Sequence, residues 1–427
     1  IGKPKQLEDR WYQKIISACL HGDSLVSMSD GSYKKIKDIK IGDKVVSYNE
    51  TKRSLPINKV TNVWNQGIKP VYRVTLENGD YLDCTRDHPI LSHFKSGKEN
   101  KLLNCPSYET TYKSLEDGLD VGMDVYTVNK SERWGKFSNT DVAKLLGYLI
   151  TDGYINLLPD TKEKRNRRTV QFANIREEYS LEFKRICEEV FDCQVTYVVK
   201  ESYIHKTTGV NRKKTYWCYV NKREKLDNFL KSIGCVDKTT REMSIFNFAL
   251  NNFNEECTKY FLNRAYAGDG SLYLGKNNSI KICLHGSYKS ELINNWHKIL
   301  RKIGCWKSIV NNRIRNDGSS SLSLISTAIS AKALLNFTGP IFGKETQSKK
   351  ILSRISELDL SKRSLKRGSF NTSTRTKIVS IEYIGEHTTY DIEVENRHNF
   401  VANNIIVHNC SAQSKVIRVG RRSGKTY

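Results

Sequence analysis

Two short stretches organise this chain: Cys19-Leu20-His21-Gly22-Asp23-Ser24-Leu25 near its start and Ile405-Ile406-Val407-His408-Asn409-Cys410 near its end. Each contains a cysteine at what looks like a join. The sequence before Cys19 resembles the opening of one protein, and from Cys410 that protein resumes. We therefore interpret residues 19–409 as an insertion, and residues 1–18 and 410–427 as pieces of its host.

Composition bounds the class of protein. The 427 residues exceed one ordinary domain, and an apolar content of 38% is sufficient for packed cores. The sequence contains no run of 18 apolar residues and no signal-peptide pattern at its start. We therefore expect no membrane partner and a cytoplasmic location with reduced thiols. The 11 cysteines include no CxxC pair, which argues against a zinc ribbon or a thioredoxin-like site.

The charge is strongly positive. The formal net charge is +24 at pH 7. An excess of this size indicates a polyanionic partner, with DNA or RNA as the leading candidate. The alternative, a basic and soluble surface without a partner, stays open at this point.

Residues 19–130 are expected to form an all-β unit of many short strands. The alternating segments are Ser24–Met28, Lys44–Tyr48, Asn58–Trp64, Lys69–Leu76 and Tyr81–Cys84. The last two flank an Asn-Gly turn, which predicts a β-hairpin. Residues 371–409 return to the same pattern, with alternating segments at Lys377–Tyr383 and Thr388–Glu395.

Several motifs identify a family resemblance. CLHGDSLV at 19–26, IKIGDKVVS at 39–47 and NGDYLDCTRDHPIL at 78–91 resemble the N-terminal half of an intein, the Hedgehog/intein splicing fold. Thr389–Val394, NRHNFVAN at 396–403 and IIVHN at 405–409 resemble its C-terminal blocks. The resemblance implies an all-β splicing domain divided into residues 19–130 and 371–409. It also implies that residues 19–409 excise themselves and ligate Ala18 to Cys410.

The resemblance assigns roles at the N-terminal junction. The Cys19 thiolate would attack the Ala18 carbonyl and convert an amide into a thioester. An amide is a poor electrophile and needs help from its surroundings. In the family this help comes from a Thr-x-x-His motif, which is Thr85 and His88 in this chain. His88 would hydrogen-bond the Ala18–Cys19 amide and protonate the departing nitrogen.

It also assigns roles at the C-terminal junction. Cys410 would take the acyl chain by transthioesterification. Asn409 would then cyclise and cut the bond to Cys410, with His408 and His398 as acid–base helpers. Asp391 would couple the two centres. No cofactor is implied for splicing.

Residues 131–370 carry an internal repeat. Asp141–Ile155 predicts a helix that is apolar nearly all round and contains an Asp152-Gly153 pair, and Lys259–Leu272 is a second copy with Asp269-Gly270. A strand, a helix, a hairpin and a further helix follow each copy. Small residues in both helices would let them pack closely and bring the two aspartates together.

The placement of these aspartates is informative. A carboxylate at a helix C-terminus is disfavoured by about 0.3–1 kcal/mol. Two of them in equivalent positions are explained if a divalent cation lies between them. The alternative is a pair of buried helices that end in ordinary Asp-Gly turns.

Both copies resemble the LAGLIDADG motif of homing endonucleases. The resemblance implies an α+β domain with a pseudo-two-fold repeat over residues 131–370, a monomer whose two sheets bind double-stranded DNA in the major groove. Asp152 and Asp269 would bind Mg²⁺ and cleave one strand each. The family's lysine before an Ile-Pro pair is not matched, and Lys238 and Lys344 are the candidates for that basic role. Expected DNA contacts are Lys206, Arg212, Lys213, Lys214, Arg313 and Arg315.

The C-terminal flank, VIRVGRRSGKTY at 416–427, resembles a variant Walker A motif. Gly424, Lys425 and Thr426 would bind nucleotide phosphates and Mg²⁺, and the flanks together look like the ATPase of a phage terminase large subunit. The competing hypothesis is a terminase-type ATPase precursor with an insertion that only binds DNA, either inert or able to splice but not to cut. The set of junction residues discriminates, because an inert insertion has no reason to keep them.

Overall fold

The computed structural model describes residues 18–100, 105–128, 134–158, 169–204, 211–275, 279–286, 290–305, 308–314, 320–326, 328–358 and 372–409. The described residues fall into two compact units. Unit 1 takes residues 18–128 and 372–409, and unit 2 takes residues 134–358. The domain boundaries expected at 130/131 and 370/371 lie outside the described residues.

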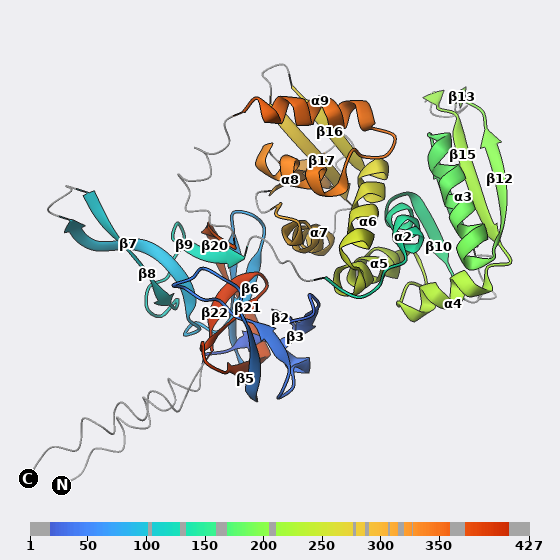
Figure 1. The fold of residues 1–427 in the computed structure, drawn as a ribbon. Coiled ribbons are helices and arrows are strands. Elements are labelled where there is room, and N and C mark those ends of the chain that lie inside the picture. Colours follow the sequence, from blue (N-terminus) through green and yellow to red (C-terminus); the bar gives the residue numbers. More distant parts are fainter. Residues whose placement is uncertain are drawn as a thin grey trace, which may run out of the picture. The chain divides into compact units, whose positions relative to one another are not determined.

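Unit 1 is built from β-strands and one short 3₁₀ helix, η1 (Ile36–Asp38) (Figure 1). Its strands are β1 (Leu20–His21), β2 (Leu25–Ser27), β3 (Tyr33–Lys35), β4 (Lys44–Val46), β5 (Ile57–Leu76), β6 (Tyr81–Cys84), β7 (Ile90–Asn100), β8 (Cys105–Lys113), β9 (Asp124–Val128), β20 (Ser373–Val394), β21 (Asn399–Ala402) and β22 (Ile405–His408).

The strands of unit 1 form one 12-stranded sheet in the order β3-β2-β21-β22-β7-β9-β20-β1-β6-β5-β4, with β8 paired to β7. In this order the C-terminal strands β20, β21 and β22 lie between strands of the N-terminal segment. The core is shared in the same way, since Leu20, Val74 and Leu82 pack in one cluster with Ile392 and Phe400. Unit 1 therefore folds only when the N-terminal and C-terminal segments come together.

The predicted Asn-Gly hairpin is confirmed, because β5 and β6 pair antiparallel with Thr75 opposite Tyr81. Four other predicted segments were divided wrongly. Asn58–Trp64 and Lys69–Leu76 belong to the single strand β5, and Lys377–Tyr383 and all of Thr388–Glu395 except Glu395 lie in the single strand β20. The interruptions are register shifts within the long β5–β20 ladder, one of them at Gly385. A bulge and a turn look alike in sequence because both favour glycine.

Unit 2 contains two copies of one arrangement. Its helices are α2 (Thr140–Asp152), α3 (Glu177–Phe191), α4 (Glu224–Ser232), α5 (Lys238–Asn252), α6 (Glu255–Gly268), α7 (Ser290–Lys302), α8 (Ala328–Thr338) and α9 (Glu345–Ser356). Its strands are β10 (Gly153–Asn156), β11 (Thr169–Asn174), β12 (Gln194–Lys200), β13 (Tyr203–Ile204), β14 (Asn211–Arg212), β15 (Thr215–Asn221), β16 (Gly270–Leu274), β17 (Ile280–Gly286), β18 (Ser308–Ile314) and β19 (Ser320–Ser326).

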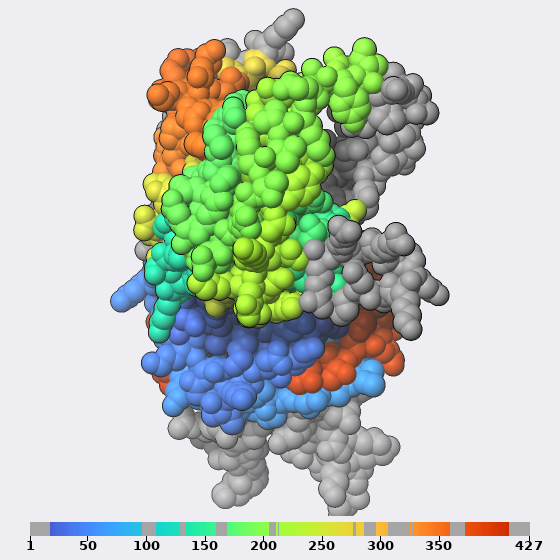
Figure 2. Space-filling view, turned by 90° about the vertical axis from the view of Figure 1, so that its right-hand side faces the viewer, coloured from blue at the N-terminus to red at the C-terminus, as the bar shows by residue number. Residues whose placement is uncertain are grey.

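The two sheets of unit 2 have the same topology. The first is β10-β11-β15-β12 and the second is β16-β17-β19-β18, both four-stranded and antiparallel. Along the chain, α2 and α6 precede β10 and β16. Helix α3 joins β11 to β12, and α7 joins β17 to β18. The first copy forms the continuous green surface in Figure 2. The first copy also carries the extra two-stranded ribbon β13–β14. Two helices that the sequence did not predict, α5 and α9, close the two copies.

Helices α2 and α6 are the apolar helices of the repeat. The Asn139 side chain caps α2 by accepting from the N–H groups of Asp141 and Val142, both at 3.1 Å. Eight residues of α2 are buried, as is expected for a helix that is apolar nearly all round. The helices approach closely, since a Cβ added at Gly147 would lie 2.7 Å from the carbonyl oxygen of Phe261. Alanine at this position would push the helices apart.

Candidate functional sites

The N-terminal junction lies between β6 and β20. Leu20 pairs with Cys84 on one side and with Tyr390 on the other. Thr85 then holds Cys19 by three hydrogen bonds. Its hydroxyl accepts from the Cys19 N–H (2.8 Å) and donates to the Cys19 carbonyl (3.2 Å), and its own N–H donates to that carbonyl (2.9 Å). The Cys19 N–H belongs to the Ala18–Cys19 peptide bond, so Thr85 contacts the bond that the family resemblance marks for cleavage.

His88 faces the same peptide bond from within the core. Its side chain is 1% exposed, and burial lowers its pKa to about 3. The Ala18 backbone raises this pKa and the charge of His408 lowers it further. Neither ring nitrogen has a hydrogen-bond partner of standard geometry among the described residues. His88, predicted to hydrogen-bond the Ala18–Cys19 amide, stands beside the Ala18 backbone as an uncharged imidazole, while the N–H of the same amide donates to Thr85.

The Cys19 sulfur is a buried free thiol. Burial raises its pKa to about 11, and the charge of Asp391 acts in the same direction. Lys69 opposes both, with its Nζ donating to Sγ at 3.4 Å. Asp391 itself is 2% exposed, and its Oδ1 accepts from the N–H of Ile392 at 2.9 Å. The sulfur therefore lies between one cation and one carboxylate.

The C-terminal junction is equally enclosed. Asn409 is fully buried, and its N–H donates to the His398 carbonyl at 2.9 Å. In the orientation that satisfies both ends of its side-chain amide, Nδ2 donates to the same carbonyl at 2.5 Å and Oδ1 accepts from the Val394 N–H at 2.7 Å. His398 reaches this position from a turn in which its φ is +53°. The nucleophilic amide predicted at Asn409 is thus held by the backbone around it.

His408 connects the two junctions. Its N–H donates to the Pro89 carbonyl at 3.0 Å, which aligns β22 with the segment directly after His88. Its ring packs edge-on against Tyr112 with the ring centroids 4.9 Å apart. Its charge acts on His88. The structure therefore groups seven of the predicted splicing residues, of which the first five are buried and the last two half-buried: Cys19, Thr85, His88, Asp391, Asn409, His398 and His408. Cys410 lies outside the described residues.

Unit 2 places its two predicted aspartates at the ends of α2 and α6. A Cβ added at Gly268, the residue before Asp269, would lie 2.9 Å from Asp152 Oδ2. Asn174 donates to that oxygen at 2.8 Å. Burial raises the pKa of both carboxyls, and the negative charge of Asp152 is the second cause that brings the pKa of Asp269 to about 7. Two carboxylates are held close enough to resist simultaneous ionisation.

A basic residue accompanies this pair. Lys344 Nζ donates to the carbonyls of Tyr266 (2.8 Å), Ala267 (2.6 Å) and Gly270 (2.6 Å), which are the last carbonyls around the end of α6. Burial lowers the pKa of Lys344 to about 8, while Asp152 and Asp269 raise it. Lys344 also lines a cavity of about 460 Å³ together with Asp152 and Asn174.

The other predicted basic residues are placed differently. Lys238 begins α5 and is not among the groups whose charge acts on either carboxyl, whereas Arg241, one turn further on, acts on both. Lys213 is exposed. Lys214 is paired with Glu201 at 2.9 Å, so its charge is already partly compensated. Residues outside the description are Lys206, Arg315, Gly424, Lys425 and Thr426, and only the backbone is described for Arg212 and Arg313.

The fit of a divalent cation to unit 2 rests on the carboxylate pair. Within the described ranges, no group of three or more His, Cys, Asp or Glu side chains is arranged to hold a metal ion. Mg²⁺ commonly takes one or two protein carboxylates and completes its shell with water and substrate phosphates. Asp152 and Asp269 meet that lower requirement, and a bound cation would relieve the repulsion between them.

The titration of Asp269 predicts a pH dependence of stability. Its pKa rises from 3.8 in the unfolded chain to about 7 in the fold. A carboxyl with a raised pKa favours the folded state while it is protonated, so this contribution is complete below pH 4 and is lost as the pH rises through 7. We expect the free energy of unfolding, relative to Asp269→Asn, to fall between pH 4 and 7 in EDTA. Chemical denaturation of both proteins across this range measures it, and a constant difference would contradict the assignment.

Comparison with known proteins bears on unit 1. A family model described as the intein splicing domain matches residues 26–409. The chain belongs to the intein splicing family. Within this intein, residues 18–128 and 372–409 form the single all-β unit that holds both junctions. No helix among the described residues is long and apolar enough to cross a membrane.

Individual relatives of the intein are distant. A replicative DNA helicase DnaB from Nostoc is 23% identical over 93% of this chain and 50% of its own length. The chain spans about half or less of the curated relatives that it matches. A DnaB intein structure from Synechocystis matches 92% of this chain and 99% of its own at 12% identity, with a TM-score of 0.29. The homing endonuclease I-WcaI, bound to its DNA recognition sequence, matches 51% of this chain and 88% of its own at 16% identity, with a TM-score of 0.35.

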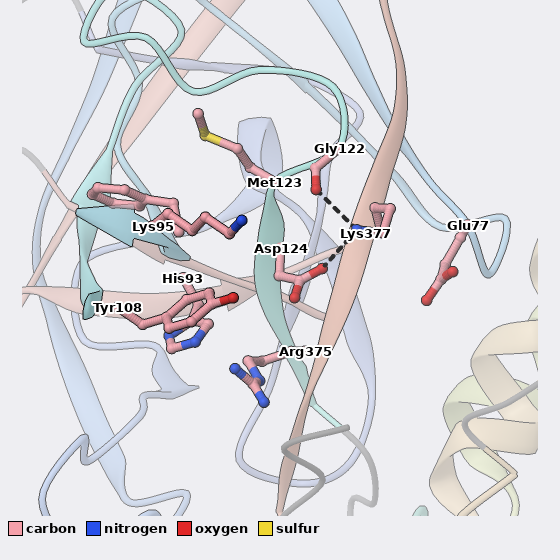
Figure 3. A pocket seen from close by; sticks show the side chains of 10 residues that line it. Glu77, His93, Lys95, Tyr108, Gly122, Met123, Asp124, Arg375 and Lys377 are labelled. Carbon is pink, nitrogen blue, oxygen red and sulfur yellow. Dashed lines mark hydrogen bonds and ion pairs between the residues drawn. The ribbon is translucent and has the colours of Figure 1, made fainter. Parts of the chain in front are cut away.

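Unit 1 also contains a cavity of about 950 Å³, which none of the junction residues lines (Figure 3). It is lined by Glu77, His93, Phe94, Lys95, Tyr108, Gly122, Met123, Asp124, Arg375 and Lys377. His93 stacks on Tyr108 with centroids 5.2 Å apart. Lys377 donates to the Gly122 carbonyl at 3.0 Å and lies 3.9 Å from Asp124. Positively and negatively charged side chains line the cavity, and none of the site residues predicted from the sequence is among them.

Three residues of these sites were not predicted from the sequence. Lys69 contacts the Cys19 sulfur, Tyr112 packs on His408, and Arg241 acts on both unit 2 carboxyls. None stands in a motif. Each lies on a strand or helix whose contact partner is distant in sequence, and the sequence alone does not predict such pairings.

Proposed function

We propose that this intein splices by an N–S acyl shift at Cys19, transthioesterification to Cys410 and cyclisation of Asn409. The observation that carries the proposal is the hydrogen bond from the Cys19 N–H to Thr85 in the same buried centre that encloses Asn409. A peptide bond whose nitrogen is held this way, beside the uncharged His88, is oriented for attack by its own side chain.

In the first step the Cys19 Sγ loses its proton and bonds to the Ala18 carbonyl carbon. The C–N bond breaks and the Cys19 nitrogen gains a proton. A neutral imidazole can accept a proton at one ring nitrogen and release one from the other, so His88 can supply the departing nitrogen without holding a lasting charge. Thr85 keeps that nitrogen in place while the bond to carbon breaks.

In the later steps the Cys410 thiolate displaces Cys19 from the thioester, and Cys19 leaves as a thiol after taking a proton. Asn409 Nδ2 then bonds to its own carbonyl carbon and releases the Cys410 nitrogen, forming a succinimide. His398 and His408 are the acid–base candidates, because they flank Asn409 in the fold. The freed Cys410 amine finally attacks the thioester and forms the Ala18–Cys410 amide.

Mass spectrometry of the expressed chain tests this proposal. The expected products are the excised segment 19–409 and a joined peptide containing the Ala18–Cys410 bond. An intact precursor that stays uncleaved under reducing conditions would overturn it.

We propose further that unit 2 is a homing endonuclease that cuts double-stranded DNA. Support comes from the repeated topology and from the two carboxylates held together where α2 and α6 end. Asp152 and Asp269 would hold Mg²⁺, which supplies Lewis-acid activation of the phosphodiester when bound. Arg241 and Lys344 would balance the phosphate charge beside them.

The face of the first sheet away from α3 suits nucleic acid. Phe172 and Cys218 face α3, since Phe172 stacks on Phe183 and Cys218 bonds to Ser180. Trp217 and Tyr219 alternate with Cys218 along β15, so they lie on the other face. There Lys200 Nζ lies 3.6 Å from the Trp217 ring centroid. Aromatic rings with a cation are a common surface for bases and phosphates. A chain that binds the joined target DNA without cutting it would instead favour an endonuclease-inactive insertion.

The identity of the host protein is a separate proposal. We propose that residues 1–18 and 410–427 belong to a terminase-type ATPase, in which Gly424, Lys425 and Thr426 would contact nucleotide phosphates. Nucleotide binding by the ligated host, absent from a Lys425→Ala variant, would test it.

A further inference from the structure

The reactivity of Cys19 poses a physical problem. The thiolate is the nucleophile in acyl transfer, but the Cys19 side chain is fully buried and lies in the field of Asp391. Both effects disfavour a negative charge on sulfur. A thiol in such a place needs a cation of its own if it is to attack a carbonyl at neutral pH.

Lys69 is placed to supply that cation. It lies on β5, opposite His387 of β20, and is half-buried. Its Nζ is 3.4 Å from Cys19 Sγ. Nearby, the Thr389 hydroxyl of β20 donates to the Gly67 carbonyl of β5 at 3.1 Å and ties the two strands together. Lys69 therefore reaches the sulfur from a strand anchored to the C-terminal segment.

We propose that Lys69 is a catalytic residue of the first splicing step, with its ammonium group donating a hydrogen bond to Cys19 Sγ and stabilising the attacking thiolate. The proposal deepens the splicing mechanism proposed above and rests on it. The Sγ–H proton is taken up by His88 as Sγ bonds to the Ala18 carbon, and His88 releases a proton to the Cys19 nitrogen as the C–N bond breaks. Lys69 keeps its proton throughout. One proton is lost from Sγ and one is gained by the nitrogen, so the step neither releases nor consumes a proton.

Other charged groups around the sulfur set the expected pH response. The charge of Asp391 on β20 disfavours the thiolate. Asp87 and His88 come from the segment after β6, and the charge of Lys69 also acts on Asp87. The charge of Lys69 favours the Cys19 thiolate, and the charge of Asp391 disfavours it. Removing Lys69 should therefore shift the pH dependence upward and not downward.

The test uses the full chain with Asn409→Ala and Cys410→Ala, which stops after the first step. Hydroxylamine cleavage at Ala18–Cys19 and iodoacetamide labelling of Cys19, mapped by peptide mass spectrometry, are followed from pH 7 to 11. In Lys69→Met we expect both profiles to move up by about one pH unit, which is about a tenfold loss of rate at pH 7. Lys69→Arg should retain the parent profile, because it keeps a charged donor.

Lys59→Met is the matched control, since Lys59 is an exposed lysine on the same strand. Asn409-dependent C-terminal cleavage in a Cys19→Ala background reports whether each variant folds. Unchanged profiles in folded Lys69→Met would overturn the role of Lys69. If the parent shows no hydroxylamine cleavage, the splicing proposal fails, and the Cys19 labelling profile still decides whether Lys69 activates the thiol.

Discussion

Replacing Asn409 by alanine is expected to reduce cleavage of the 409–410 bond by about 10³-fold or more, because the substitution deletes the nucleophile itself. The N-terminal junction should still react, since Cys19, Thr85 and His88 form a separate set of contacts. A branched or thioester intermediate should therefore accumulate without ligated product. Denaturing gels and intact-protein mass spectrometry measure both junctions in one sample.

Asn62→Ala is a suitable control for this experiment, because Asn62 is an exposed amide on β5 and its side chain contacts Glu393 on the surface. It should splice at the parent rate. Cutting at the C-terminal junction that persists in Asn409→Ala would show that another group breaks this bond.

Asp152→Asn and Asp269→Asn are each expected to abolish cutting of one DNA strand. Loss of the outer-shell partners of metal ligands alone costs 10–100-fold, so the loss of a ligand should cost about 100-fold or more for its strand. With Mg²⁺, the parent should linearise a supercoiled plasmid that carries the joined coding sequence of the two flanks. Each variant should give a nicked circle, and the double variant should leave the plasmid intact.

Asp141→Asn is the matched control on the same helix, because Asp141 lies at the start of α2 and pairs with Lys144 and Arg185 on the surface. It should cut like the parent. If both single variants form linear product at the parent rate, neither aspartate takes part in DNA cleavage.

The sequence predicted the local features well where one segment carried the whole signal. The Asn-Gly hairpin, the burial of α2 and the repeated order of elements in unit 2 follow from periodicity and turn chemistry, which act over a few residues. The resemblance to inteins, carried by short motifs, implied the residues that meet at the junctions. It divided β5 and β20 wrongly, because a bulge inside a long ladder and a turn between strands have the same local composition.

The sequence could not supply contacts that depend on register. Lys69 is one of many lysines until β20 pairs with β5 and brings it to 3.4 Å from the Cys19 sulfur. The sequence predicts a basic role for Lys238, but the residue of α5 whose positive charge acts on both carboxyls is Arg241, one helical turn further on.

By itself, the sequence determined the chemistry that is available: two junction cysteines, a Thr-x-x-His motif, a terminal His-Asn pair and two repeated aspartates. The tertiary structure alone decided what surrounds them. Interleaving of the N-terminal and C-terminal strands buries Cys19, His88 and Asn409 in one core. Burial, and then the charge of Asp152 across the closely packed α2 and α6, raise the pKa of Asp269 to about 7. The physical reason is that burial and the distances between charges govern pKa and reactivity, and both depend on residues that are remote in the chain.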